Sequence, residues 1–200
     1  MRRARPGTLV VGVDPGNNRS GVSMWRDGSP VFSVTHEPWA LCAPSGPLRA
    51  HLEYATETGP CPDDVRIFVE VPQNGTHKSR GGVHWAAGMV VARLQDTLQV
   101  RREKVHKVTP TRWRSPLVGP AARVSQTVIG RGRRGSVPKA EVLALADDVA
   151  GGWGLSFDSE DEAEAVLIGL YGCLELGVTV QGWSRVYEGR YGAPWEGVVR

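Results

Sequence analysis

The stretch that decides the fold of this chain is LVVGVDPG, residues 9–16. Its first five residues are apolar or glycine, a composition typical of a strand that is buried on both faces. Asp14, Pro15 and Gly16 follow directly, and these residue types favour a tight turn. Asp14 therefore ends the strand, at the edge where open α/β sheets place their ligands. It serves there either as a turn residue or as a functional carboxylate.

The segments around this strand predict a mixed α/β sheet. We expect further strands at residues 21–25, 31–34, 65–69 and 105–108, the first two joined by a hairpin turn at Asp27-Gly28. We expect helices near residues 48–56 and 83–100, a short helical piece from Pro110, a helix from Pro138 to Gly151-Gly152, and a last helix over 160–176 capped by Asp158 or Ser159. This order predicts a mixed five-stranded sheet with helices on both faces.

Length and composition exclude several classes of protein. The chain has 200 residues, 40% hydrophobic and 22% charged, so we expect one folded domain and not a disordered chain. It contains no run of about 18 apolar residues, which argues against a transmembrane helix, and its N-terminus lacks the long apolar run of a signal peptide. We expect no membrane among its partners. Cys42, Cys61 and Cys173 have unrelated spacings, which is typical of reduced thiols in a cytoplasmic protein.

Basic residues concentrate in the middle of the chain. Residues 101–139 contain eleven lysines and arginines and one acid, Glu103, so this segment carries a charge of +10. The net charge of the whole chain is +3, which leaves the remainder at −7. A concentrated basic segment is typical of a protein that binds a polyanion, above all a nucleic acid. A solvated charged surface is the alternative interpretation.

Four acids stand where metal-dependent chemistry would use them. Asp14 and Glu70 each end an apolar strand, and Asp161 and Glu164 lie three residues apart on the last predicted helix, so these two share one face. A helix packed beside the two strands would bring the four carboxylates together, and such a group repels itself unless a cation neutralises it. Oxygen ligands favour Mg²⁺ or Mn²⁺, and two such ions about 4 Å apart can promote displacement at a phosphodiester.

Each acid also has a purely structural interpretation. Glu70 could be an exposed strand end, and Asp161, flanked by Glu160 and Glu162, could simply complement the helix dipole. Glu164 is harder to explain in this way, because it lies in an apolar stretch where an unpaired carboxylate would be costly. The combination of the four acids therefore indicates chemistry more strongly than any single one.

In order and spacing these motifs resemble the RuvC-type Holliday-junction resolvases, which have the RNase H-like (retroviral-integrase) fold. The resemblance rests on VGVDPG at 11–16 with Ser20-Gly21-Val22, Val69-Glu70 with Asn74, Val108-Thr109-Pro110 with Trp113-Arg114 and Lys139, and Asp161-Glu162-Ala163-Glu164-Ala165. It is closer to the divergent phage-like branch, because Glu164 stands where Asp is usual. Gln73 replaces an aromatic residue that often stacks on a base in this family. His77 or Trp85 could replace that aromatic, although we expect a loop and a helix-packing residue there.

The resemblance implies a homodimeric, Mg²⁺-dependent endonuclease that cuts four-way DNA junctions symmetrically. Asp14, Glu70, Asp161 and Glu164 would then be catalytic ligands of two Mg²⁺ ions, for which Mn²⁺ would substitute, and Lys139 would contact the scissile phosphate. The residues expected to bind DNA phosphates are Lys78, Arg80, Arg112, Arg114, Arg131, Arg133 and Arg134. The nuclease domain would span residues 9–176, between a basic arm at 1–8 and an unassigned extension at 177–200.

Two other classes of function stay open on the sequence. An actin-like nucleotide-binding protein shares the strand–Asp–Gly opening, but it needs two such halves, and 200 residues are too few for both. A catalytically silent RNase H-like module that binds nucleic acid or helps to process RNA would keep the fold without resolving a junction. The four acids argue against silence, whereas the choice between RNA and DNA stays open.

Overall fold

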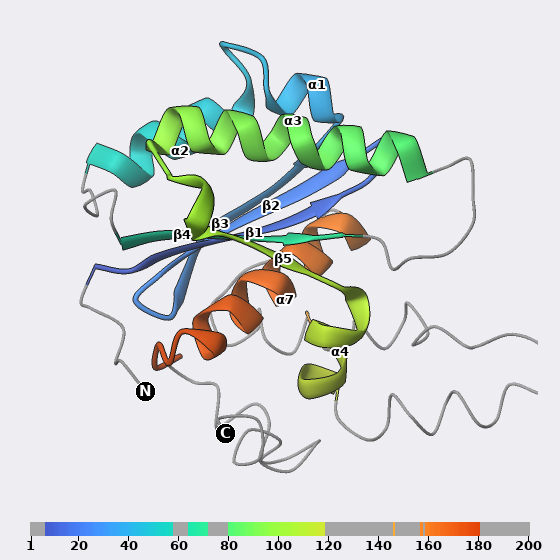
Figure 1. The fold of residues 1–200 in the computed structure, drawn as a ribbon. Coiled ribbons are helices and arrows are strands. Elements are labelled where there is room, and N and C mark those ends of the chain that lie inside the picture. Colours follow the sequence, from blue (N-terminus) through green and yellow to red (C-terminus); the bar gives the residue numbers. More distant parts are fainter. Residues whose placement is uncertain are drawn as a thin grey trace, which may run out of the picture.

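The computed structural model describes residues 7–57, 64–71, 80–118, 146, 157 and 159–180. Its strands are β1 (Leu9–Pro15), β2 (Ser20–Arg26), β3 (Ser29–His36), β4 (Val65–Glu70) and β5 (Val105–Val108). They form one sheet in the order β3-β2-β1-β4-β5 (Figure 1). β1, β2 and β3 pair antiparallel, whereas β4 runs parallel to β1 and β5 runs parallel to β4. The predicted mixed five-stranded sheet is confirmed.

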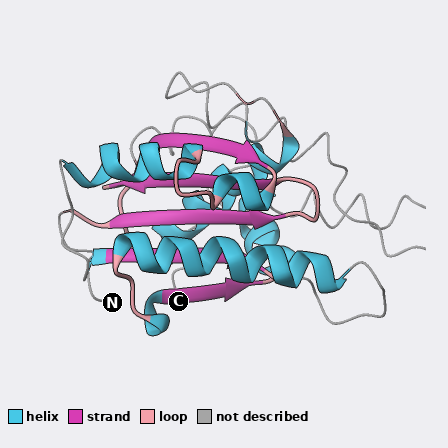
Figure 2. Cartoon of the chain, turned by 90° about the horizontal axis from the view of Figure 1, so that it is seen from above, coloured by secondary structure: helices cyan, strands magenta, loops and turns pink. Residues whose placement is uncertain are grey.

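Helices cover both faces of this sheet. One face carries α1 (Pro38–Leu41), α2 (Pro47–Glu57) and α3 (Arg80–Leu98), and Figure 2 shows the molecule from that side. The other face carries α4 (Pro110–Val118) and α7 (Glu160–Glu175), and a short 3₁₀ turn, η2 (Arg102–Lys104), leads into β5. No helix in the described part of the chain combines the length and apolarity needed to cross a membrane.

The hairpin between β2 and β3 turns at the predicted residues, Asp27 and Gly28. Both have positive φ angles, 50° and 81°, which is the combination that a type I′ turn requires. Glycine adopts such angles freely, and aspartate tolerates them better than most residues. The Asp27 side chain also accepts a hydrogen bond from the Gly7 N–H at 2.8 Å, which ties the turn to the segment before β1.

Side-chain alternation along the strands aims the acids of β1 and β4 at the same face. Val11 of β1 packs in the core beneath α2 and α3, whereas Val10 of β1 and Phe68 of β4 pack in the core beneath α7. Asp14 and Glu70 lie an even number of residues beyond Val10 and Phe68. Because alternate residues of a strand share a face, both carboxylates point to the side that α7 covers.

Backbone contact between α7 and the sheet depends on two glycines. A β-carbon on Gly12 of β1 would collide with the carbonyl oxygen of Ala165, and a β-carbon on Gly21 of β2 would collide with that of Asp161. The hydroxyl of Ser23 donates to the same Ala165 carbonyl at 2.7 Å. The first turns of α7 are therefore held directly against β1 and β2.

The start of α7 is fixed by two side-chain hydrogen bonds. The Ser159 hydroxyl accepts from the backbone N–H of Glu162 at 3.2 Å, so Ser159 is the N-cap, as one of the two predicted options had it. The carboxylate of Glu162 in turn accepts from the hydroxyl of Ser33 on β3. Glu162 thus anchors the helix to the sheet edge.

Two sequence-based interpretations change with the structure. We expected Trp85 to be a helix-packing residue, but its side chain is 59% exposed, because α3 turns Ala86 and Val90 toward the sheet instead. In the segment left unassigned, Val178 and Val180 are buried in the core beneath α7. The helix expected from Pro138 lies outside the described residues except for Ala146, which is helical and buried.

Gly12→Ala should lower the free energy of unfolding by about 1–3 kcal/mol, because the added methyl group meets the α7 backbone. Gly88→Ala is the matched control: Gly88 is exposed on α3 and an added β-carbon there meets no atom within 4 Å. That control should raise the free energy of unfolding by about 0.5–1 kcal/mol. Urea unfolding checks both variants, and equal effects would contradict the close contact between α7 and β1.

Candidate metal centre

Parallel pairing places two acids at one edge of the sheet. Asp14 lies near the end of β1, and Glu70 ends the neighbouring β4, which runs in the same direction. The side chains face the same side of the sheet, and Asp14 is only 8% exposed. The carboxyl ends of these strands therefore form a shielded acidic corner, as expected from the sequence.

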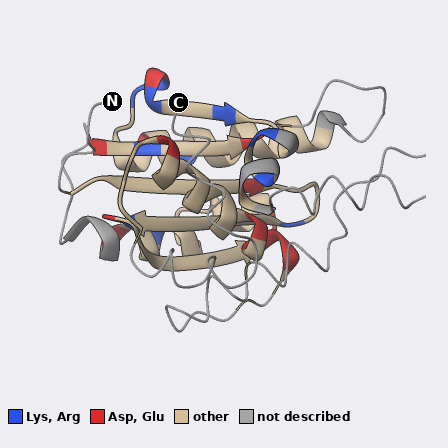
Figure 3. Cartoon of the chain, turned by 90° about the horizontal axis from the view of Figure 1, so that it is seen from below, with Lys and Arg blue, Asp and Glu red and all other residues tan. Residues whose placement is uncertain are grey.

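α7 adds a third carboxylate to this corner. Glu164 lies in the second turn of the helix, next to Ala165, whose carbonyl contacts Gly12 of β1. One carboxylate oxygen from each of Asp14, Glu70 and Glu164 lies within 4.8 Å of the other two. We call these three residues the acidic triad. In Figure 3 one group of acidic residues, in red, lies at the end of the sheet where α7 begins.

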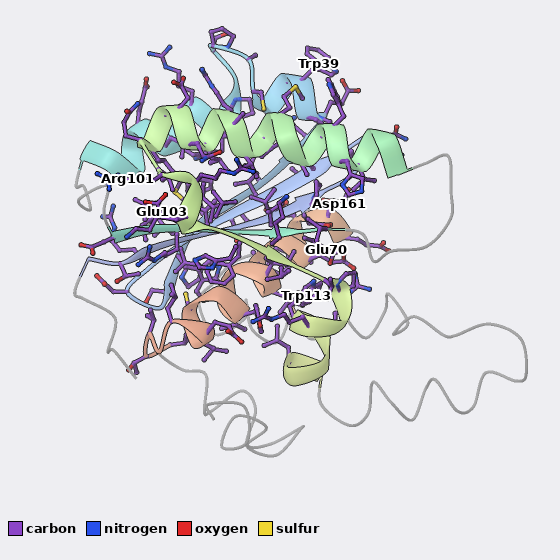
Figure 4. The ribbon with its side chains drawn as sticks, in the orientation of Figure 1. Trp39, Glu70, Arg101, Glu103, Trp113 and Asp161 are labelled. Atoms are coloured by element: carbon purple, nitrogen blue, oxygen red, sulfur yellow. The ribbon has the colours of Figure 1, made fainter. Side chains whose placement is uncertain are left out.

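Asp161, the fourth predicted acid, lies beside the triad and not within it. Its backbone carbonyl contacts Gly21, the β2 residue paired with Asp14, and Figure 4 labels Asp161 and Glu70 at the same end of the sheet. Its carboxylate is not part of the group within 4.8 Å, although its charge helps to raise the pKa of Asp14. The structure thus brings three of the four acids into ligand range of one another.

Burial and crowding raise the pKa values in the triad. The pKa of Asp14 is well above its ordinary value, first because Asp14 is buried and then because the charges of Glu164, Glu70 and Asp161 oppose its ionisation. Burial also raises the pKa of Glu70 to about 7, against the opposing effects of Arg114 and of a hydrogen bond from Trp113. Shifts of this kind, at a strand edge and with named causes, are typical of functional sites.

Two neighbouring residues of α4 contact the triad directly. Nε1 of Trp113 donates to Oε2 of Glu70 at 2.6 Å. Nη2 of Arg114 donates to Oε2 of Glu164 at 2.8 Å and lies 3.9 Å from Oε2 of Glu70. The Arg114 guanidinium also lies over the Trp113 ring, 4.9 Å from its centre. Arg114, which the sequence predicts to bind DNA phosphate, thus pairs with carboxylates of the triad, and Trp113 joins the site although no sequence motif predicts a role for it there.

The sequence does contain a signal that places the start of α4 beside the triad. β5 runs parallel to β4 and pairs with it as far as Glu70, so it ends at the acidic corner. Pro110 then starts α4 two residues after the end of β5, and proline is favoured in a first helical turn. Residues 113 and 114 therefore fall about one turn into a helix that begins beside the triad.

The other described basic residues of the 101–139 segment do not gather at the triad. The side chain of Arg112 is 62% exposed and interacts with the Tyr171 hydroxyl at 3.1 Å and the Glu175 carboxylate at 3.8 Å. Arg101 lies at the opposite end of β5 from Glu70, as Figure 4 shows. Arg101 and Arg112 thus lie away from the triad, whereas Arg114 contacts it.

Several predicted site residues fall outside the described residues, namely Lys78, Arg131, Arg133, Arg134 and Lys139, as do Gln73 and His77. Arg80 begins α3, but its side chain is not among those described. Among the acids of the first turn of α7, Glu162 is bonded to Ser33 on β3 and takes no part in the triad.

The triad suits a hard divalent cation. All its donors are carboxylate oxygens, contributed by three separate elements, and the side chains of Glu70 and Glu164 are 15% and 12% exposed. Such oxygen ligands favour Mg²⁺ or Mn²⁺ over softer metals. Burial and the neighbouring negative charges, which raise the pKa values of Asp14 and Glu70, both oppose ionisation, and a bound divalent ion would offset that cost.

Mn²⁺ should raise the melting temperature more at pH 8 than at pH 6. The pKa of Glu70 is raised to about 7 from an ordinary 4.5, so the folded protein favours the protonated carboxyl. The protonated Glu70 carboxyl stabilises the folded protein at low pH. This stabilisation is lost as the pH rises through about 7, when the ionised carboxylate becomes available to an ion. Scanning fluorimetry checks this, and Glu70→Gln should shrink the difference. Equal Mn²⁺ shifts at both pH values would contradict it.

A solved structure of RuvC shares this fold. No protein-family model matches the chain, and no curated protein matches it significantly. The Thermus thermophilus RuvC structure aligns with a TM-score of 0.52 and 17% identity, over 86% of this chain and 98% of that one. T. thermophilus RuvC in complex with a Holliday junction substrate aligns at 0.48 and 15% identity, over 92% and 98% of the chains. The yeast mitochondrial Holliday junction resolvase aligns at 0.39 and 14% identity, over 93% and 86%. The chain has the RuvC-type, RNase H-like fold that its motifs predict.

Proposed function

We propose that this protein is a Mg²⁺-dependent endonuclease that resolves four-way DNA junctions. The observation that carries the proposal is the triad, whose three carboxylates lie within 4.8 Å of one another where β1 and β4 end. The RuvC-type fold and the order of the acidic motifs along the chain support the same assignment. The proposed functional unit is a homodimer, because symmetrical cutting of a junction requires two sites related by a twofold axis.

The triad and the neighbouring Asp161 are proposed to hold two Mg²⁺ ions, for which Mn²⁺ would substitute. When bound, such a pair would stabilise the charge on the attacking and leaving oxygens of a phosphodiester displacement. Asp14 is proposed to serve both ions, because the charges of Glu70, Asp161 and Glu164 all act on it. Lys139 is proposed to contact the scissile phosphate, where its ammonium would stabilise developing negative charge.

Binding of the DNA backbone is assigned to a set of basic side chains predicted from the sequence. Of these, Arg112 has an exposed side chain on α4, two residues before Arg114. Lys78, Arg80, Arg131, Arg133 and Arg134 complete the proposed set. Contacts to phosphate position a duplex without reading its sequence, which fits a substrate defined by its branched shape.

Exposed Trp85 is proposed to stack on a base near the branch point. α3 begins close to the turn that follows Asp14, because a β-carbon on Gly82 of α3 would collide with the side chain of Asn17. Trp85 lies three residues beyond Gly82 and offers an accessible ring, and base–aromatic stacking tolerates any sequence.

The direct experiment compares a synthetic four-way junction, a linear duplex and a structured RNA, each with and without Mg²⁺. Mg²⁺-dependent cleavage of the junction alone supports the proposal. Cleavage of the RNA alone, or tight binding without cleavage, would instead identify an RNA-processing or silent RNase H-like module. Tight binding of ATP would favour the actin-like class.

Asp14→Asn should reduce junction cleavage by roughly 100-fold or more, since even the outer partners of metal ligands contribute 10–100-fold. Junction binding should be largely retained, because phosphate contacts supply it. Glu162→Gln is the matched control, since Glu162 lies on the same helix as Glu164 but bonds to Ser33 outside the triad. Gel-shift and cleavage assays measure both quantities. Full Mg²⁺-dependent activity of Asp14→Asn would refute the site.

Replacing Arg131, Arg133 and Arg134 together by alanine should weaken junction binding and make it less sensitive to salt. Each lost phosphate contact lowers the slope of log affinity against log salt by about 0.9, so the loss should approach three. Fluorescence anisotropy at several salt concentrations measures the slope. An unchanged slope would remove these arginines from the DNA-binding set.

A further inference from the structure

A guanidinium group lies among the carboxylates of the triad. Arg114 is 2.8 Å from Glu164 and 3.9 Å from Glu70, and its side chain is only 18% exposed. Its Nε is buried and has no hydrogen-bond partner within the described part of the chain. Arg112 on the same helix is 62% exposed, as expected for a residue available to DNA. Arg114 is therefore paired with the carboxylates of the triad and largely shielded from solvent.

Arg114 supplies the counter-charge that this crowded group requires. Of the basic side chains that the structure describes, it is the one in ion pairs with the triad. Its charge also opposes the rise in the pKa values of both Asp14 and Glu70. Three carboxylates at such short range repel one another strongly, so loss of this cation without replacement would push them apart.

We propose that Arg114 is an exchangeable counter-ion of the triad, which holds Glu70 and Glu164 together without metal and competes with a divalent cation for them. The proposal rests on the proposed function only in requiring that the triad binds a divalent ion. The reason is electrostatic: a guanidinium against these oxygens and a divalent ion bound to them repel each other at short range.

Trp113 should affect the metal affinity of the triad in the opposite direction to Arg114. Its indole N–H is neutral and donates to Oε2 of Glu70 at 2.6 Å from a fully buried ring. Because it carries no charge, it does not repel an ion, and it fixes the orientation of a proposed ligand. Loss of such a partner weakens metal binding. Two adjacent residues of α4 are thus predicted to change metal affinity in opposite directions.

The test measures Mn²⁺ binding to the full chain by calorimetry, with electron paramagnetic resonance of free Mn²⁺ as a second readout. Arg114→Gln should bind Mn²⁺ about tenfold more tightly than wild type, because the competing charge is gone. Its metal-free melting temperature should be lower. Trp113→Phe should bind Mn²⁺ about tenfold more weakly. Arg112→Gln is the control and should leave Mn²⁺ affinity unchanged, since Arg112 pairs with Glu175 and Tyr171.

An affinity of Arg114→Gln for Mn²⁺ equal to or weaker than that of wild type would overturn the proposal, because a merely structural arginine would weaken the site when removed. If Arg114→Gln does not fold, a titration of the wild-type protein tests the proposal instead. In protein labelled with ¹⁵N-arginine, the Nε–H signal of Arg114 is identified as the one that the spectrum of Arg114→Lys lacks. In the wild type this signal should shift on saturation with Mg²⁺, whereas the signals of the other arginines should not move. A signal unchanged by Mg²⁺ would overturn the proposal.

The outcome is separable from that of the proposed function. Tighter Mn²⁺ binding by Arg114→Gln in a protein that cleaves no junction would support the counter-ion and refute the resolvase. Junction cleavage by the wild type, with unchanged Mn²⁺ affinity in Arg114→Gln, would support the resolvase and refute the counter-ion. Absence of Mn²⁺ binding in the wild type and in every variant would refute the counter-ion.

Discussion

The candidate site depends on how the mutual repulsion of three shielded carboxylates is offset. Asp14, Glu70 and Glu164 come from two strands and a helix, and their oxygens lie within 4.8 Å of one another. Such a group persists only if cations or protons neutralise it, and both are represented here, by the ion pairs of Arg114 and by the raised pKa values of Asp14 and Glu70. A site that must be neutralised in this way is suited to a divalent ion.

The scaffold holds the triad through backbone contacts on regular elements and not through loops. Gly12 and Gly21 let α7 touch β1 and β2, while Ser33 ties Glu162 of the same helix to β3. Parallel pairing of β1, β4 and β5 then brings Asp14, Glu70 and the start of α4 to one edge. Rigid elements of this kind position ligand groups more accurately than loops do, and a metal site requires such accuracy.

Sequence reasoning recovered what local patterns encode and missed what depends on side-chain direction. Apolar strands, the Asp27-Gly28 turn and the Ser159 cap are local features, and the structure confirms them. Asp14, Glu70 and Glu164 were found because strand ends and helix spacing place them. The inward turn of Arg114, the offset of Asp161 from the triad and the exposure of Trp85 depend on which neighbours each element meets, and no local pattern records that.

Anomalous diffraction from crystals of the protein equilibrated with Mn²⁺ tests the central claim most directly. The account predicts a manganese peak bound by oxygens of Asp14, Glu70 and Glu164, with the Arg114 guanidinium displaced from Glu164. A triad that stays closed around Arg114 at saturating Mn²⁺, with no peak between its carboxylates, would contradict it.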